Sequence, residues 1–224
     1  ERNVISSIFY SRTSRALPAL KIYYLLICQS RICRCILNNL KPFCQKIFQS
    51  HLIMNLVAID FETADNGPDS ACAIGMVRVV DGEVVATQSH LIQPPRQDMR
   101  YTYIHGITWD DVCGEPVFAD IWPKMKAFME GADWLAAHNA GFDRRVLTAC
   151  CDAAGFAPPE IPYLCTVKLA RQAWDIRPTK LPDVCRYLVI PLRHHDHSSD
   201  AMACAKIVVA AVEDGCDVTK ARLN

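Results

Sequence analysis

The chain has 224 residues, 51% of them hydrophobic and 21% charged, and this length suits one α/β domain with an appendage. The formal net charge of zero hides a division: residues 1–53 carry eight Lys or Arg and one acid, for a net of +7, so residues 54–224 carry a net of −7. This excludes a strongly basic nucleic-acid-binding domain, and any phosphate would have to be met by metal ions or a few local cations.

Residues 1–53 differ in composition from the rest of the chain. They contain no glycine, are rich in Arg, Ser and Ile, and their longest apolar run, Ile22–Cys28, is too short to span a bilayer. A transit peptide and a genuine extra element both fit this composition. We favour an N-terminal extension upstream of a start at Met54, because Met54 directly precedes the first clear strand pattern. Residues 54–224 are therefore expected to form the domain.

This boundary predicts the outcome of a truncation. A chain that begins at Met54 should fold, stay soluble and unfold at the same temperature as the whole chain, because the core is expected to be built from residues 54–224 alone. Thermal unfolding of the two chains measures the difference. A loss of several kcal/mol on truncation would place residues 1–53 inside the domain.

From residue 54 onward the hydrophobic pattern predicts three strands and then an alternation of helices and strands. The first strands are expected at Leu56–Phe61, Ala71–Val80 and Glu83–Ile92. The later elements are helices at Phe118–Met129 and Ala140–Ala154, strands at Trp134–Ala137 and Tyr163–Thr166, short helices at Val167–Trp174 and Leu181–Leu188, and a closing helix at His197–Asp214. This order predicts an α/β fold with a mixed sheet covered by helices.

The first strand carries two acids, Asp60 and Glu62, at the end of an apolar run. Side chains alternate along a strand, so both carboxylates project from the same face. Two charges in this place are costly unless something compensates them, and a divalent cation is the obvious partner. Taken alone, the pattern also fits a solvated strand end.

A second acid begins a predicted helix. In His138-Asn139-Ala140-Gly141-Phe142-Asp143, Asn139 is the expected N-cap, and Asp143 lies about one turn into the helix, on its apolar stripe. An acid on an apolar stripe is unusual. The plainer reading is a surface acid stabilised by the helix dipole.

The third cluster surrounds Asp200, which borders the apolar stripe at the start of the closing helix. His195 lies on the loop before this helix, and the run of His194, His195 and His197 could alternatively be a zinc site. Considered together, the three clusters supply four inward-facing acids and a loop histidine. That is the inventory of a two-metal hydrolase.

The twelve cysteines include no C-x-x-C pair. Reduced, mostly buried thiols in a cytoplasmic protein are the favoured interpretation, with structural zinc or disulfides as alternatives.

In order and spacing, the three clusters resemble the exonuclease motifs of the DEDDh superfamily. The matching stretches are Asp60-Phe61-Glu62-Thr63, His138-Asn139-Ala140-Gly141-Phe142-Asp143 and His195-x-x-x-x-Asp200. The likeness covers about residues 55–212 and points to the proofreading exonucleases of bacterial DNA polymerase III and the PolC-type exonuclease domain. It implies a ribonuclease-H-like fold, with a central mixed sheet of about five strands flanked by helices.

For the chemistry, the resemblance implies a 3′→5′ exonuclease that uses two Mg²⁺ or Mn²⁺ ions and releases nucleoside 5′-monophosphates. Asp60 would bridge the two ions, Glu62 and Asp200 would hold one of them, and Asp143 the other. His195 would be the general base, a role suited to a group that titrates near neutrality.

The resemblance also places four residues near the substrate, namely Phe61, Thr63, His105 and Asn139. Core packing is the alternative role for Phe61, and a structural turn is the alternative for His105. The expected substrate is a single strand with a free 3′ end, DNA being favoured over RNA. Association with a DNA polymerase is a further implication, and no membrane is expected.

Two questions remain at this point. His197-Ser198 departs from the relatives, which commonly carry Ala-Leu there, so spacing alone favours His195 over His194 or His197 as the base. The competing function is a catalytically inactive relative that binds nucleic acid or a polymerase. Its signature would be a missing ligand, and here all five positions are filled.

Overall fold

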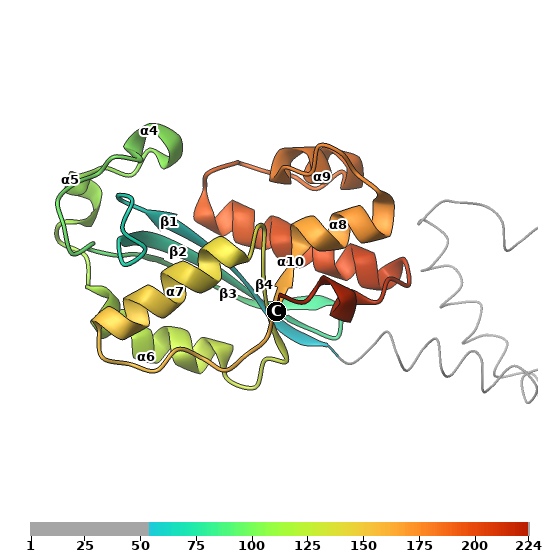
Figure 1. Ribbon diagram of the computed structural model, residues 1–224, viewed down its shortest axis with the longest axis horizontal. Helices are drawn as coiled ribbons and strands as arrows, with labels where there is room; N and C mark the ends of the chain where they lie inside the picture. The colour runs from blue at the N-terminus through green and yellow to red at the C-terminus, as the bar shows by residue number, and fades with distance from the viewer. Residues whose placement is uncertain (1–53, 224) are drawn as a thin grey trace, which may run out of the picture. The chain divides into compact units, whose positions relative to one another are not determined.

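The computed structural model describes residues 54–223, and its centre is a five-stranded mixed sheet (Figure 1). The strand order is β3-β2-β1-β4-β5, where β1 is Asn55–Thr63, β2 is Ala71–Val80, β3 is Glu83–Leu91, β4 is Trp134–Ala137 and β5 is Tyr163–Cys165. The pairs β1–β2 and β2–β3 are antiparallel, whereas β1–β4 and β4–β5 are parallel. The predicted mixed sheet is confirmed. The predictions for residues 1–53 lie outside the described residues.

The long helices match the predicted ranges to within about one residue. They are α6 (Phe118–Met129), α7 (Gly141–Ala153), α8 (Thr166–Trp174), α9 (Leu181–Leu188) and α10 (His197–Glu213). The short elements α4 (Thr102–His105), α5 (Trp109–Val112) and the 3₁₀-helix η1 (Val218–Ala221) were not predicted. A single turn is too short to show an apolar stripe at helical spacing.

Alternate residues of β1 pack into two cores, one on each face of the sheet. Val57, Ile59 and Phe61 contact the core that contains α6 and α7. Leu56 and Ala58 contact the core built from α8, α9 and α10. Figure 1 shows the same division, with α6 and α7 on one side of the strands and α8 to α10 on the other. Asp60 and Glu62 continue the second series and therefore face the start of α10.

The end of α9 has a strained backbone conformation at an exposed residue. Val189 is 86% exposed and has a φ of 57°, in the left-handed region. That region costs an L-residue about 1–2 kcal/mol, whereas glycine tolerates it at about 0.5–1 kcal/mol of extra chain entropy. Val189→Gly should therefore raise the midpoint of thermal unfolding slightly. Val189→Ala, which keeps the Cβ atom, is the control and should gain less. A lower midpoint for the glycine variant would contradict this account.

Candidate active site

The four predicted acids line one open cavity of about 380 Å³ near the carboxyl ends of β1 and β4. Of the other residues predicted for the site, Phe61, Asn139 and His195 also line it. Thr63 and His105 do not belong to this lining. The remaining lining residues are His138, Phe142, Val167, Thr179, Lys180, Leu181 and His194, of which the sequence had offered His194 as an alternative base or zinc ligand.

Asp143 connects the start of α7 to the end of β1. Its side chain is 2% exposed, and its Oδ1 atom accepts a hydrogen bond from the Phe61 N–H at 3.1 Å. This contact lies between the two acids of β1 in sequence. Because the two elements are far apart in the chain, the hydrogen bond fixes the position of the third carboxylate relative to the first two.

The expectation that Asn139 caps α7 is wrong. The N-cap residue is Ala140, and Asn139 has a φ of 65°, in the left-handed region that asparagine tolerates. The Asn139 carbonyl oxygen instead accepts the Phe142 N–H at 2.8 Å. The chain thus makes a tight turn between β4 and α7, the helix starts one residue later, and Asn139 lies exposed at the cavity.

Asp200 is held in place by two contacts from the loop that precedes α10. It is 4% exposed, and its Oδ2 atom accepts the His195 N–H at 3.1 Å and lies 2.9 Å from Nδ1 of His194. Its Oδ1 atom is buried and has no hydrogen-bond partner among the described residues. The preceding turn is fixed by Asp196, which caps α10 by accepting the Ser199 N–H at 3.0 Å.

Burial raises the pKa of all four carboxyl groups above their ordinary values. For Asp60 the burial is reinforced by repulsion from Asp143, Asp200 and Glu62. Burial, followed by repulsion from Asp200 and Asp143, raises the pKa of Glu62 from 4.5 to about 8. Burial likewise raises the pKa of Asp143 from 3.8 to about 7. The pKa of Asp200 rises for the same reason, against the hydrogen bonds from His195 and His194.

These residues fit divalent cations. Four carboxylates that share one cavity repel one another, and bound positive charge removes the repulsion. The unpartnered Oδ1 atom of Asp200 would supply one ligand oxygen. Carboxylate oxygens are the ligands that Mg²⁺ prefers, and Mn²⁺ takes the same set.

The histidines of the third cluster separate in space. His195 has a φ of 69°, and its ring stacks on that of His194 with 3.8 Å between the ring centroids. Both rings line the cavity. His197 is placed differently, with its Nε2 atom 2.8 Å from Oγ of Ser89 on β3. His195 therefore lies at the cavity and His197 does not line it, and which of them is the base stays a prediction. His194 also lines the cavity, so it stays an alternative to His195 by position.

The start of α10 packs against a row of paired residues on three neighbouring strands. Asp60 pairs with Gly75, and Gly75 pairs with Ser89, so these three residues share the sheet face that α10 covers. A Cβ atom at Gly75 would lie only 2.1 Å from the carbonyl oxygen of His197. The missing side chain of Gly75 therefore allows the first turn of α10 to approach the sheet, and His197 reaches across to Ser89.

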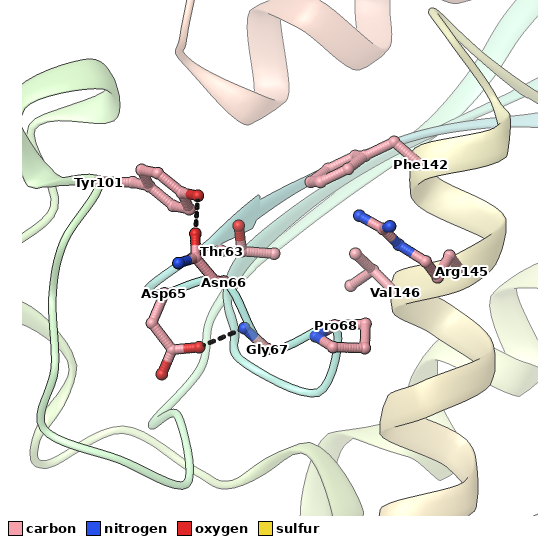
Figure 2. A pocket seen from close by; sticks show the side chains of 9 residues that line it. All are labelled: Thr63, Asp65, Asn66, Gly67, Pro68, Tyr101, Phe142, Arg145 and Val146. Atoms are coloured by element: carbon pink, nitrogen blue, oxygen red, sulfur yellow. Dashed lines mark hydrogen bonds between the residues drawn. The ribbon is translucent and has the colours of Figure 1, made fainter.

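His105 and Thr63 border the site rather than line its main cavity. The His105 ring is held by the backbone, because Nδ1 accepts the Ile107 N–H at 3.0 Å and Nε2 lies 3.2 Å from the Thr63 carbonyl oxygen. This supports the structural-turn alternative for His105. Thr63 lines a smaller cavity of about 150 Å³ (Figure 2). Figure 2 shows Phe142 and Arg145 of α7 opposite the loop of residues 65–68, and Phe142 borders both cavities.

His138 of the second motif has a supporting role. Its Nδ1 atom lies 2.9 Å from Oγ1 of Thr166, and its Nε2 atom lies 3.1 Å from the Thr179 carbonyl oxygen. Burial lowers its pKa to about 4, so the ring is neutral. His138 therefore fastens the start of α8 and the loop before α9 to the end of β4.

The cysteines of residues 54–223 form no disulfides. Eight of them are free and six are buried.

Within residues 54–223 no helix is both long and apolar enough to cross a bilayer.

Comparisons with known proteins agree with this geometry. Residues 57–208 match the RNase T exonuclease family model. A PolC-type DNA polymerase III of Thermotoga petrophila is 32% identical over 161 residues, which cover 70% of this chain and 12% of that protein. Exodeoxyribonuclease 10 of Escherichia coli is 39% identical over 104 residues, covering 45% of this chain and 40% of that protein. The chain thus spans less than half the length of these relatives.

Two solved structures share the fold. Exonuclease X, in complex with 5′ overhanging duplex DNA, is 27% identical with a TM-score of 0.61, over 74% of this chain and 96% of that chain. The nuclease domain of 3′hExo, a DEDDh family member bound to rAMP, is 20% identical with a TM-score of 0.64, over 74% and 95%. The mixed sheet thus matches the expected ribonuclease-H-like fold. The chain therefore belongs to the exonuclease family that the RNase T model describes.

Proposed function

We propose that this chain is a 3′→5′ exonuclease that hydrolyses the terminal phosphodiester bond of single-stranded DNA, with RNA as the second substrate class, and releases nucleoside 5′-monophosphates. The observation that carries this proposal is the gathering of four carboxylates from β1, α7 and α10 in one cavity, two of them, Asp143 and Asp200, fully buried. Two divalent cations, Mg²⁺ or Mn²⁺, would satisfy them.

The four acids would divide the work of holding the cations. Asp60 would touch both ions, Glu62 and Asp200 one of them, and Asp143 the other. When bound, the ions stabilise the charge that develops on the attacking and leaving oxygens. Lys180 lines the same cavity and offers a cation to a backbone phosphate.

His195 would take the proton from the attacking water. It is exposed on the loop before α10, where it can reach a bound substrate. Burial, and then the neighbouring His194, lowers the pKa of His195, so its imidazole is neutral near neutral pH. A neutral imidazole is the form that accepts a proton.

The relatives support the choice of substrate. Both curated relatives are named for DNA enzymes, a polymerase and an exodeoxyribonuclease. The solved neighbours include proteins bound to DNA and to rAMP, and a 3′-exonuclease that recognises a histone mRNA stem-loop. We therefore place DNA before RNA. Association with a DNA polymerase and a reducing, cytoplasmic location also belong to the proposal, the latter supported by the buried thiols.

A labelled single strand tests the direction and the product. With Mn²⁺ titrated into metal-free protein, a strand labelled at its 3′ end should release labelled 5′-mononucleotide first. The same strand labelled at its 5′ end should lose its label last. Internal fragments, or early loss of the 5′ label, would rule out the proposal. Metal-dependent binding without any release would favour the inactive alternative. Matched DNA and RNA strands rank the two substrate classes.

Gly75 gives a prediction that does not touch the carboxylates. Gly75→Ala should displace the first turn of α10, because the new Cβ atom would meet the His197 carbonyl oxygen at 2.1 Å. Overpacking of this kind costs about 1–3 kcal/mol, and misplacement of catalytic groups by about 1 Å can lower turnover about 10²-fold. Turnover and thermal unfolding measure the two effects. Gly114→Ala is the control, since no atom lies within 4 Å of a Cβ there. Wild-type turnover in folded Gly75→Ala would refute the close-approach argument.

A further inference from the structure

We propose that His194, His195 and Asp200 form a binding site for a transition-metal ion such as Zn²⁺, and that occupancy of this site switches the exonuclease off. The first half concerns metal binding alone. The second half rests on the proposed function, because it requires that Asp200 and His195 serve the hydrolysis.

The three side chains already lie close enough together to bind one metal ion. Each offers one ligand atom, and these atoms lie within 4.8 Å of one another. Nδ1 of His194 is 2.9 Å from Oδ2 of Asp200, and the two imidazole rings stack at 3.8 Å with 24° between their planes. A tetrahedral Zn²⁺ site with bonds of about 2.0–2.1 Å sets its donors about 3.3 Å apart. Small side-chain rotations would bring the donors to this spacing, and the His194 side chain is 39% exposed.

A second observation points to a cation at this place. Asp200 is 4% exposed, and its Oδ1 atom is buried without a hydrogen-bond partner among the described residues. A buried carboxylate oxygen without a donor is costly. A metal ion bound by the two imidazoles and by Oδ1 of Asp200 would satisfy that oxygen.

The backbone holds the cluster in place before any ion binds. His195 has a φ of 69°, a conformation rare for a residue with a Cβ atom, and its N–H donates to Oδ2 of Asp200 at 3.1 Å. The same loop is fixed by the Arg193 N–H, which donates to Oγ of Ser199 at 2.8 Å. His197 is outside the cluster, since its Nε2 atom is engaged with Ser89 at 2.8 Å.

The kind of ligand atom distinguishes this site from the two proposed Mg²⁺ or Mn²⁺ positions that the four carboxylates would hold. Imidazole nitrogen suits Zn²⁺ and similar ions, whereas Mg²⁺ prefers oxygen ligands. Both sites need Asp200, so the two occupancies compete. An ion held by His195 also occupies the nitrogen lone pair that accepts the proton in hydrolysis. Zn²⁺ should therefore inhibit, and a higher Mg²⁺ concentration should weaken the inhibition.

Binding is tested first and without activity. The protein is first freed of bound metal and placed in millimolar Mg²⁺, and Zn²⁺ is then titrated into it calorimetrically. His194→Ala and the more conservative His194→Gln should each weaken Zn²⁺ binding by at least about tenfold, since even the loss of a partner outside the ligands costs about 10–100-fold. His197→Ala is the matched control and should bind Zn²⁺ like the wild type. Equal affinity in the wild type and in both His194 variants overturns the site.

Inhibition is tested second, by mononucleotide release in Mg²⁺ with increasing Zn²⁺. The wild type should be inhibited at Zn²⁺ concentrations that fill the site, and His194→Gln should require at least about ten times more. Equal inhibition of both proteins would show that Zn²⁺ acts at the carboxylates alone, which overturns the switch. A third outcome is Zn²⁺ binding that depends on His194 in a protein that releases no mononucleotide. This outcome supports the Zn²⁺ site, whereas the proposed function and the switch both fail.

Discussion

Asp60→Ala and Asp200→Ala should each abolish mononucleotide release and leave the protein folded. Each change removes a proposed metal ligand, and each also removes one of the mutually repelling carboxylates of the cavity. Activity at saturating Mn²⁺ and thermal unfolding measure the two effects. Asp152→Ala, an exposed acid on α7, is the control and should keep full activity. Turnover above about a tenth of the wild type in either variant would contradict the assignment of these ligands.

The same carboxylates predict how stability depends on pH in metal-free protein. Burial raises the pKa of Glu62 from 4.5 to about 8 and that of Asp143 from 3.8 to about 7. The folded state therefore holds these protons more tightly than the unfolded state. Their stabilising contribution is complete below about pH 4 and is lost as the pH rises through about 7–8.

Thermal unfolding without metal measures this loss. Because of these groups, the unfolding temperature should fall between about pH 6 and about pH 9, and Asp200→Ala should reduce the fall. Millimolar Mg²⁺ or Mn²⁺ should raise the unfolding temperature at the higher pH, because the ions bind only the folded state. An unfolding temperature that ignores the metal would count against a carboxylate site.

His195→Ala should lower turnover by at least about 10²-fold with little loss of metal binding, since general-base catalysis typically contributes about 10²–10⁴-fold. The proposed ligands all remain in this variant. A higher pH should partly restore turnover, because hydroxide replaces the missing base. Turnover against pH, together with calorimetric Mn²⁺ binding, separates the loss of a base from the loss of a metal ligand.

The neighbouring histidines provide the controls for this experiment. His194→Ala and His197→Ala should stay within roughly tenfold of the wild type, because a loop histidine outside the proton transfer contributes little. His197 has its Nε2 atom at Ser89, and His194 has its Nδ1 atom at Asp200. If either of these variants is inactive while His195→Ala turns over normally, the proton acceptor is a different histidine and the motif assignment fails there.

The sequence by itself determined the strands, the long helices and the order of the acids along them. Periodicity is a local property, so alternation along β1 placed Asp60 and Glu62 on one face, and helical spacing placed Asp143 on an apolar stripe and Asp200 at the border of another. The structure confirms the five strands and the long helices and brings the four acids to one cavity. The roles of these acids and of His195 remain predictions.

Only the tertiary structure decided which long-range contacts position the site residues and how burial shifts the pKa values of their carboxyl groups. The contact of His197 with Ser89 joins residues 108 positions apart, and the Phe61 N–H meets Asp143 across 82 positions. No local pattern encodes such contacts, nor the close approach of α10 to Gly75. Burial is a property of the folded chain as well, so the raised pKa of Glu62 and the unpartnered oxygen of Asp200 appear only when the two faces of the sheet are covered.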